Sequence, residues 1–173
     1  MKSTISITFR RCINTNDTTK PYPMDILTET NGEFTITTDK SKMDLATIHR
    51  FLSEESYWCK NVPVKRVKKA MDHSLNFGVF HGDRQVGYAR VISDFSSVAY
   101  LGDVFILKEF RGQGLSKWMM ETIISHPELQ GLRRWILLTA DAHELYRKYG
   151  WTNIKNPEKW MEKHDPDAYK KPE

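Results

Sequence analysis

Apolar and polar residues follow two different periods along this chain, and the period changes in a definite order. Four segments show the three-to-four-residue spacing of a helix, and six show alternation or a short apolar run, as strands do. The expected segments are a strand at 33–39, helices at 42–53 and 64–74, strands at 75–82, 85–94 and 97–107, a helix at 114–125, a strand at 133–139, a helix at 141–150, and a strand from residue 151. This order predicts a mixed α/β domain.

Boundary residues support several of these segments. Asp44 can cap the first helix, and Pro63 stands where a first-turn proline favours the second. The turn-like HGDR, 81–84, separates two strand segments and predicts a hairpin. Pro127 ends the third helix and Gly150 ends the fourth.

The chain before these segments has a different character. Residues 15–23, TNDTTKPYP, are rich in turn formers and read as a linker. We therefore expect residues 1–31 to be an irregular or flexible N-terminal extension, with Met24 as an alternative start of the folded part. Residues 32–173 are predicted to form a single domain, since 173 residues suit one domain with a full core.

Composition narrows the functional classes. The chain has 26 basic and 22 acidic residues, a net charge of +4 that fits an anionic ligand without demanding nucleic acid. Its cysteines, Cys12 and Cys59, form neither a disulfide framework nor a zinc motif, which predicts a reduced, cytoplasmic protein without a metal. No run approaches the length of a membrane span, so no membrane partner is expected.

The stretch 111–114, RGQG, stands between a predicted strand and a predicted helix. Glycines allow a backbone to approach an anion closely, and the first amides of a helix favour negative charge. Neither of the commoner phosphate motifs is present. Taken alone, the stretch is compatible with a phosphate site or with a simple tight turn.

A second motif favours the phosphate site. The string RGQGLS, 111–116, follows the strand GDVFIL and precedes ELYRKYGW, 144–151, by about thirty residues. The pair resembles the two signatures of the GNAT family of N-acetyltransferases, with the resemblance extending over residues 33–155. It implies the GNAT fold: a mixed central sheet of six to seven strands, with splayed cofactor-binding strands and about four helices. Two positions depart from the usual pattern, Ser116 for Gly or Ala and Thr139 for Asn.

The resemblance also implies where acetyl-CoA binds. Pantetheine lies between the splayed strands in this family, and the glycine turn holds the pyrophosphate. The backbone of Val104 and Ile106 is expected to bond the cosubstrate, with the Val104 amide as donor to the thioester carbonyl. The full expected cofactor set is Val104, Phe105, Ile106, Arg111, Gly112, Gln113, Gly114, Leu115, Ser116 and Thr139.

The family resemblance also implies candidate catalytic residues. Tyr146 is expected to protonate the leaving thiolate, and Asp103 is a candidate base or anchor for the amine, with His143 as a weaker candidate base. Tyr57 and Trp58 lie in the loop that walls the acceptor pocket in this family, although simple aromatic packing is an alternative. Arg90 and the run KRVKK, 65–69, are most simply solvated faces.

The combined prediction is an acetyl-CoA-dependent N-acetyltransferase that transfers the acetyl group directly to a primary amine of a small molecule or peptide. An acyl-CoA-binding sensor with little turnover is the alternative. A nucleic-acid module is a third class, but the five Trp residues are scattered rather than interleaved with basic residues. The sequence leaves the acceptor and the oligomeric state, including a homodimer, open.

Overall fold

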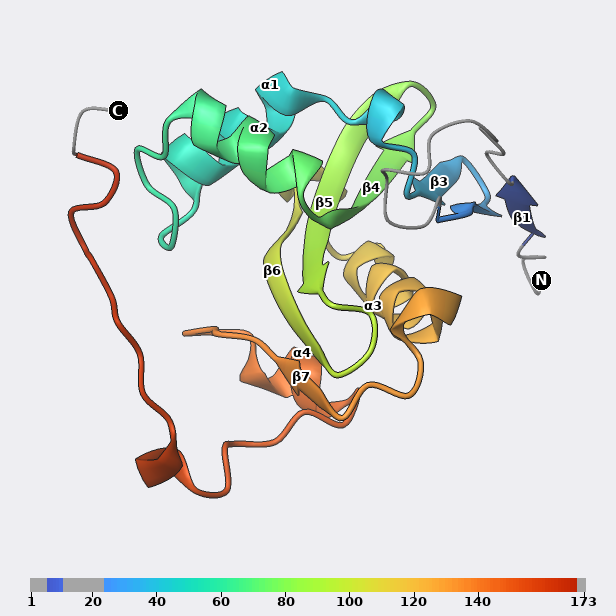
Figure 1. The fold of residues 1–173 in the computed structure, drawn as a ribbon. Helices are drawn as coiled ribbons and strands as arrows, with labels where there is room; N and C mark the ends of the chain where they lie inside the picture. Colours follow the sequence, from blue (N-terminus) through green and yellow to red (C-terminus); the bar gives the residue numbers. More distant parts are fainter. Residues whose placement is uncertain (1–5, 11–23, 171–173) are drawn as a thin grey trace, which may run out of the picture.

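A computed structural model describes residues 6–10 and 24–170 of the chain. The described strands form one seven-stranded sheet in which each strand lies beside the next in sequence. They are β1 (Ser6–Arg10), β2 (Ile26–Asn31), β3 (Phe34–Thr37), β4 (Leu75–His81), β5 (Arg84–Ser93), β6 (Val98–Ile106) and β7 (Arg134–Ile136). Successive pairs are antiparallel except β6 and β7, which are parallel (Figure 1).

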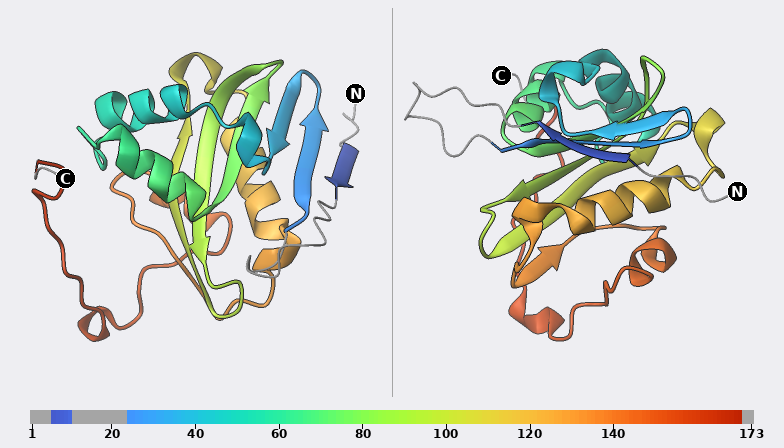
Figure 2. Two further views of the ribbon diagram at one scale, coloured as in Figure 1. Left: turned by 45° about the horizontal axis from the view of Figure 1, so that its top comes forward. Right: turned by 90° about the vertical axis from the view of Figure 1, so that its right-hand side faces the viewer.

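Helices cover both faces of the sheet. The α-helices are α1 (Leu45–Arg50), α2 (Val64–Asp72), α3 (Leu115–Ser125) and α4 (His143–Arg147). Figure 2 shows α1 and α2 on one face and α3 on the other. Each face has its own apolar core: Phe77, Met119 and Ile123 belong to the core on the α3 side, whereas Ile48 and Phe105 belong to the core beneath α1 and α2. The described residues form a mixed α/β fold with a seven-stranded sheet and four α-helices, which confirms the predicted fold class.

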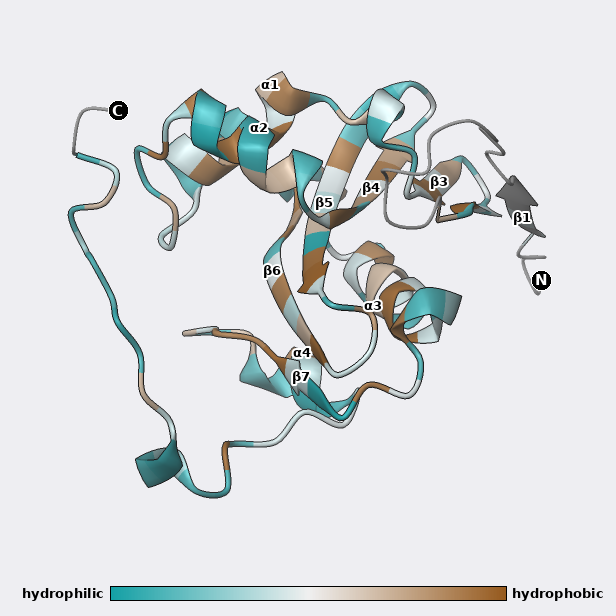
Figure 3. Cartoon of the chain, in the orientation of Figure 1, coloured by the Kyte–Doolittle hydropathy of each residue, from teal (hydrophilic) through white to brown (hydrophobic). Residues whose placement is uncertain are grey.

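Local chemistry explains the elements that were predicted well. The Asp44 carboxylate accepts hydrogen bonds from the backbone of Ala46 and Thr47 and so caps α1. Gly82, with φ of +57°, turns the β4–β5 hairpin. Apolar residues concentrate along the central strands, while the outer face of α2 is hydrophilic (Figure 3). The pattern of the central strands therefore reflects burial on both faces.

The predicted extension at 1–31 is wrong for the parts of it that the structure describes. β1 and β2 add two strands to the sheet there. β2 has the sequence ILTETN, whose polar residues hide its strand character. Its inward-facing Glu29 is only 6% exposed, and the Trp118 indole N–H of α3 donates a hydrogen bond to its carboxylate. Residues 1–5 and 11–23, with Cys12, lie outside the described residues.

The C-terminal elements are shorter than predicted. The strand expected at 133–139 is confined to β7, and the helix expected at 141–150 to α4. The predicted strand from Trp151 is wrong, since residues 151–170 contain no strand. Trp151 packs against Trp135 and Tyr146, but the residues after it are largely exposed, including the apolar Ile154 and Met161. That segment runs along the outside of the molecule from β7 toward α2 (Figure 1).

Candidate active site

β6 and β7 lie side by side only where they begin. Three residue pairs join them, Val98 with Arg134, Ala99 with Trp135, and Tyr100 with Ile136. β6 continues to Ile106, whereas β7 ends at Ile136 and Leu138 is 72% exposed. Within the described chain, the second half of β6 therefore has no strand partner on its β7 side. This separation confirms the predicted splay of the two strands.

A bulge distorts β6 at the start of the splay. Tyr88 pairs with Phe105 and Arg90 with Gly102, so Ala89 of β5 faces two residues, Asp103 and Val104. Asp103 has φ of +55°, which is uncommon for a residue other than glycine. A bulge re-aims the backbone groups of a strand. Here it takes Asp103 and Val104, both predicted site residues, out of the regular ladder.

The RGQG turn closes one end of the gap. Gly112 and Gly114 have φ of +80° and +82°, a region that glycine occupies without strain. A Cβ built at either position meets no atom within 4 Å, so the turn is open to a ligand. Gly114 caps α3, and the first helical amides that reach a carbonyl are those of Lys117 and Trp118. The earlier amides have no partner within the helix, so the turn fits a phosphate group.

The other predicted cofactor residues are distributed along this same path. Arg111 Nε donates to the Ile106 carbonyl at 2.9 Å, which ties the turn to the end of β6. Phe105 and Leu115 are buried, so these two positions can offer a ligand only their backbone. Thr139 accepts a hydrogen bond from the Ala142 amide at 3.0 Å through its hydroxyl, and so supports the start of α4. Gln113 is exposed and Ser116 is half-buried.

Tyr146 lies at the opposite side of the gap, on α4. It is 8% exposed and belongs to the core that contains α3, with the Trp151 ring 5.9 Å away, centroid to centroid. Burial, followed by the nearby Tyr57 hydroxyl and Asp141 carboxylate, raises the pKa of Tyr146 to about 12. The phenol therefore keeps its proton throughout the physiological range and can act as a proton donor.

The Tyr57 side chain connects two loops near the end of the sheet. Its hydroxyl donates to Asp141 Oδ1 at 3.2 Å and accepts from the Ala140 amide at 2.9 Å. The loop between α1 and α2 is thereby joined to the loop between β7 and α4. Trp58 packs edge to face on Tyr57 and also contacts Phe51. The two aromatic residues thus pack on the protein, as the alternative expected, and neither lines the cavities described below.

Asp103 and Arg90 form an ion pair beneath α2. Arg90 Nε donates to Asp103 Oδ2, and the two side chains are 17% and 9% exposed. Although burial disfavours the charged guanidinium, the carboxylate of Asp103 raises the pKa of Arg90. The pair borders a cavity of about 450 Å³ whose other walls come from α2, the connection between α1 and α2, and the C-terminal segment. The expectation of a solvated Arg90 is wrong, since the residue occupies the face of β5 shared with buried Tyr88.

Cys59 borders the same cavity. Its Sγ lies 3.9 Å from Asp103 Oδ1, so the thiol has an acidic neighbour that the sequence did not indicate. Burial and the Asp103 charge raise the pKa of the thiol to about 11. A neutral thiol is a poor nucleophile. This geometry gives no support to a covalent route through Cys59.

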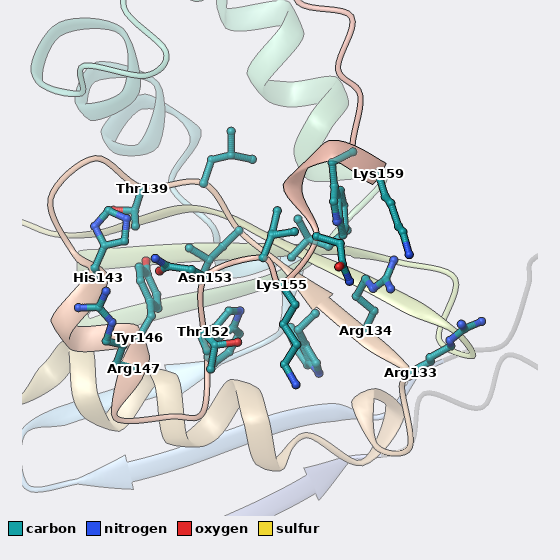
Figure 4. A pocket seen from close by; sticks show the side chains of 18 of the residues that line it. Arg133, Arg134, Thr139, His143, Tyr146, Arg147, Thr152, Asn153, Lys155 and Lys159 are labelled. Atoms are coloured by element: carbon teal, nitrogen blue, oxygen red, sulfur yellow. The ribbon is translucent and has the colours of Figure 1, made fainter.

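A larger cavity, of about 1170 Å³, lies between β7, α4 and residues 151–161. Figure 4 shows Thr139, His143 and Tyr146 on one side of it. Its basic lining residues are Arg133, Arg134, Arg147, Lys155 and Lys159, and no acidic residue lines it. Such a wall favours an anionic ligand. His143, the weaker candidate base, is exposed at this cavity and not beside Asp103.

The described residues also bear on metal sites and on membrane spans. No group of three or more His, Cys, Asp or Glu side chains there could hold a metal ion. None of the helices in that part of the chain has the length and apolar character that a membrane span requires.

Sequence reasoning missed Arg90 and Tyr169 as neighbours of Asp103. For Arg90 a signal was present, because it alternates with Tyr88 and Ile92 along β5 and so shares their face. For Tyr169 there was none, since it stands in a polar segment and reaches the cavity only through the path of the chain.

Known proteins are similar to this chain in sequence and fold. The model of the acetyltransferase (GNAT) family matches residues 45–151. A Gibberella zeae protein named as an inferred acetyltransferase is 30% identical over 141 residues, 69% of this chain and 78% of its own. A solved GNAT-family structure from Xanthomonas campestris is 49% identical, with a TM-score of 0.78, and covers 80% of this chain and 97% of its own. A Clostridium acetobutylicum structure that contains acetyl-CoA shares the fold at 14% identity and a TM-score of 0.53, covering 76% and 94%.

The family model spans both the glycine turn and Tyr146, the two ends of the gap between β6 and β7. The family match and the likeness in sequence and fold agree, and the chain belongs to the acetyltransferase (GNAT) family.

Proposed function

We propose that this protein transfers an acetyl group from acetyl-CoA directly to a primary amine of a small molecule or peptide. The observation that carries the proposal is the gap between β6 and β7, with an open glycine turn at one end and a protonated Tyr146 at the other. An acyl-CoA sensor needs the gap and the turn but has no use for a buried phenol at the reaction centre. The enzyme is therefore the favoured function.

The chain supplies the binding elements for the cosubstrate. The amides at the start of α3 hold the pyrophosphate, and the free edge of β6 hydrogen-bonds the pantetheine arm through Val104 and Ile106. Acetyl-CoA brings the activated thioester. The Val104 amide, which the bulge removes from the ladder, donates to the acetyl carbonyl oxygen.

Tyr146 and Asp103 act on the leaving group and on the amine. As the C–N bond forms and the C–S bond breaks, Tyr146 gives its proton to the sulfur of the departing thiolate, since its raised pKa keeps it protonated. The proton that the amine nitrogen loses passes to Asp103 or to water. Asp103 anchors the acceptor through Oδ1, whose neighbour Cys59 is only a weak donor at 3.9 Å, while Oδ2 stays paired with Arg90. The cavity of about 450 Å³ beside Asp103 then receives the rest of the amine.

Tyr146→Phe tests the chemical role of the phenol. The variant keeps the buried ring and its contact with Trp151 but loses the proton donor, so kcat is expected to fall at least tenfold, about 1.4 kcal/mol of barrier. Release of free thiol is followed with acetyl-CoA and a panel of amines, and acetyl-CoA affinity is measured by calorimetry. Affinity is expected to be unchanged.

Tyr149→Phe is the matched control, because Tyr149 lies on the same segment and its hydroxyl donates to the Lys117 carbonyl at 3.0 Å. It should leave kcat within about twofold, well under 1 kcal/mol. A Tyr146→Phe enzyme with the wild-type rate from pH 7 to 9 removes Tyr146 from the mechanism. Tight acetyl-CoA binding without thiol release on any amine favours the sensor instead.

A further inference from the structure

The C-terminal segment returns to the sheet at one residue. Residues 161–167 are exposed, and Met161 is 96% exposed. A turn then forms around Asp165, whose carboxylate accepts from the Asp167 amide at 3.1 Å and whose carbonyl accepts from the Ala168 amide at 3.2 Å. This turn brings Tyr169, 36% exposed, against the protein.

Tyr169 lies against the cavity that Asp103 borders. Its hydroxyl is 3.9 Å from Cys59 Sγ, and the Arg66 guanidinium carbon lies 5.8 Å from the centre of its ring. Together with Arg90 and Asp103 it lines the cavity of about 450 Å³. A residue 110 positions away in sequence from Cys59 thus completes the wall opposite β6.

The environment of the phenol agrees with this placement. Burial raises the pKa of Tyr169 to about 12, with further contributions from Cys59 and Asp103. The neighbouring Lys170 pairs instead with Asp167 at 2.8 Å, and its side chain is 77% exposed. Adjacent residues of one segment therefore have opposite roles, one toward the cavity and one toward solvent.

We propose that Tyr169 closes the cavity beside Asp103 and thereby limits the size of the amine that the enzyme accepts. The inference rests on the proposed function, since it takes this cavity as the acceptor site. The apolar part of the remaining lining comes from Leu52, Val62, Val67 and Ala70, which belong to α2 and to the connection between α1 and α2. Basic side chains of Arg66, Lys69 and His73 also line the cavity. Tyr169 is the lining residue that comes from the C-terminal segment, so truncation of its side chain enlarges the cavity without changing the sheet or the helices.

Alkylation of Cys59 tests the closure without any turnover. In a Cys12→Ser background, the rate of modification by iodoacetamide at pH 8 is followed by intact mass. Tyr169→Ala is expected to accelerate it at least fivefold, because the ring no longer shields the thiol. Tyr169→Phe keeps the ring and loses the hydroxyl contact that lowers the thiol pKa, so its rate should not exceed that of the wild type. Lys170→Ala is the matched control and should leave the rate unchanged.

Acceptor selectivity tests the consequence. With the best small amine of the panel and its benzyl-substituted derivative, the ratio of kcat/KM for the larger to the smaller should rise at least fivefold in Tyr169→Ala. The KM for acetyl-CoA should stay as in the wild type, and Lys170→Ala should keep the wild-type ratio. Thermal unfolding establishes that each variant is folded.

Either of two results overturns the inference. An unchanged alkylation rate in Tyr169→Ala means that the ring does not cover the cavity, and faster alkylation with an unchanged selectivity ratio means that it does not set acceptor size. If the wild type acetylates no amine, the proposed function fails, while the alkylation rates still decide whether Tyr169 closes the cavity. The two failures are thus distinguishable.

Discussion

Replacement of Glu29 by alanine should weaken the attachment of α3 to the sheet. Glu29 is on β2, and its Oε2 accepts hydrogen bonds from Trp118 Nε1 at 3.1 Å and from the Thr122 hydroxyl at 2.7 Å. All three residues are buried. Thr122 has a second acceptor, the Trp118 carbonyl at 3.1 Å, whereas the indole N–H has no second acceptor among the described residues. The alanine variant therefore leaves the buried Trp118 indole N–H without an acceptor.

The size of the effect follows from these contacts. A buried donor without a partner costs about 1–3 kcal/mol, and the lost methylene packing adds about 1 kcal/mol. We expect Glu29→Ala to lower the free energy of unfolding by about 3 kcal/mol, or the melting temperature by about 6–12 °C for a domain of this size. Glu29→Gln keeps an amide oxygen that can accept both bonds, so about 1 kcal/mol or less is expected.

Urea unfolding followed by far-UV circular dichroism measures both variants. The double variant Glu29→Ala with Trp118→Phe removes the stranded donor as well, and a coupling of about 1–2 kcal/mol between the two sites is expected. Equal losses for alanine and glutamine, or a loss below about 1 kcal/mol for alanine, would refute the reasoning, because the carboxylate would then contribute little as an acceptor.

Two further predictions concern the turn and pH. Gly114→Ala should raise the KM for acetyl-CoA at least fivefold, because a φ of +82° costs alanine about 1–2 kcal/mol and the turn must shift. Gly131→Ala is the control, since Gly131 has a φ of +72° and equally open surroundings. It carries similar strain away from the turn and should leave the KM for acetyl-CoA unchanged. Equal KM values in the two variants would contradict a role for the turn. Burial lowers the pKa of His126 to about 4, so the folded state favours the neutral imidazole. The stability that this group contributes is complete above pH 6.5 and is lost as the pH falls toward 4. The expected loss in the free energy of unfolding is about 2 kcal/mol at pH 5. His126→Asn keeps an acceptor for the Glu128 amide without titrating, so in urea unfolding at pH 7 and 5 it should lack this loss; an identical loss in both proteins would assign it to other groups.

Features encoded locally were predictable from the sequence. The glycine turn and α3 follow one another in the chain, and both can be recognised without knowing what lies around them. Tyr146 was found through a motif on a single helix. The gap itself could be expected only from the family resemblance, because three residue pairs between distant segments define it.

Features that depend on distant contacts were not predictable. The Arg90–Asp103 pair requires both the register of β5 on β6 and the bulge that re-aims Asp103. β2 was missed because Glu29 replaces the apolar residue that an inward position usually has, and its partners lie 89 and 93 positions away. The path of the C-terminal segment to Tyr169 rests on a small turn that leaves no periodic pattern.

The short junction between β6 and β7 also bears on how the molecule opens. β7 and α4 are joined to the rest of the protein by three residue pairs, by a few apolar side chains such as Tyr146 and Trp151, and by the hydrogen bonds of Tyr57. A unit with so little attachment unfolds locally at a lower free energy than the central strands, and its amides exchange hydrogen sooner. A ligand that bridges the gap adds its binding free energy to this weak junction. The cosubstrate of such an enzyme is then also a structural part of the sheet, and slowed hydrogen exchange in β7 and α4 reports its binding.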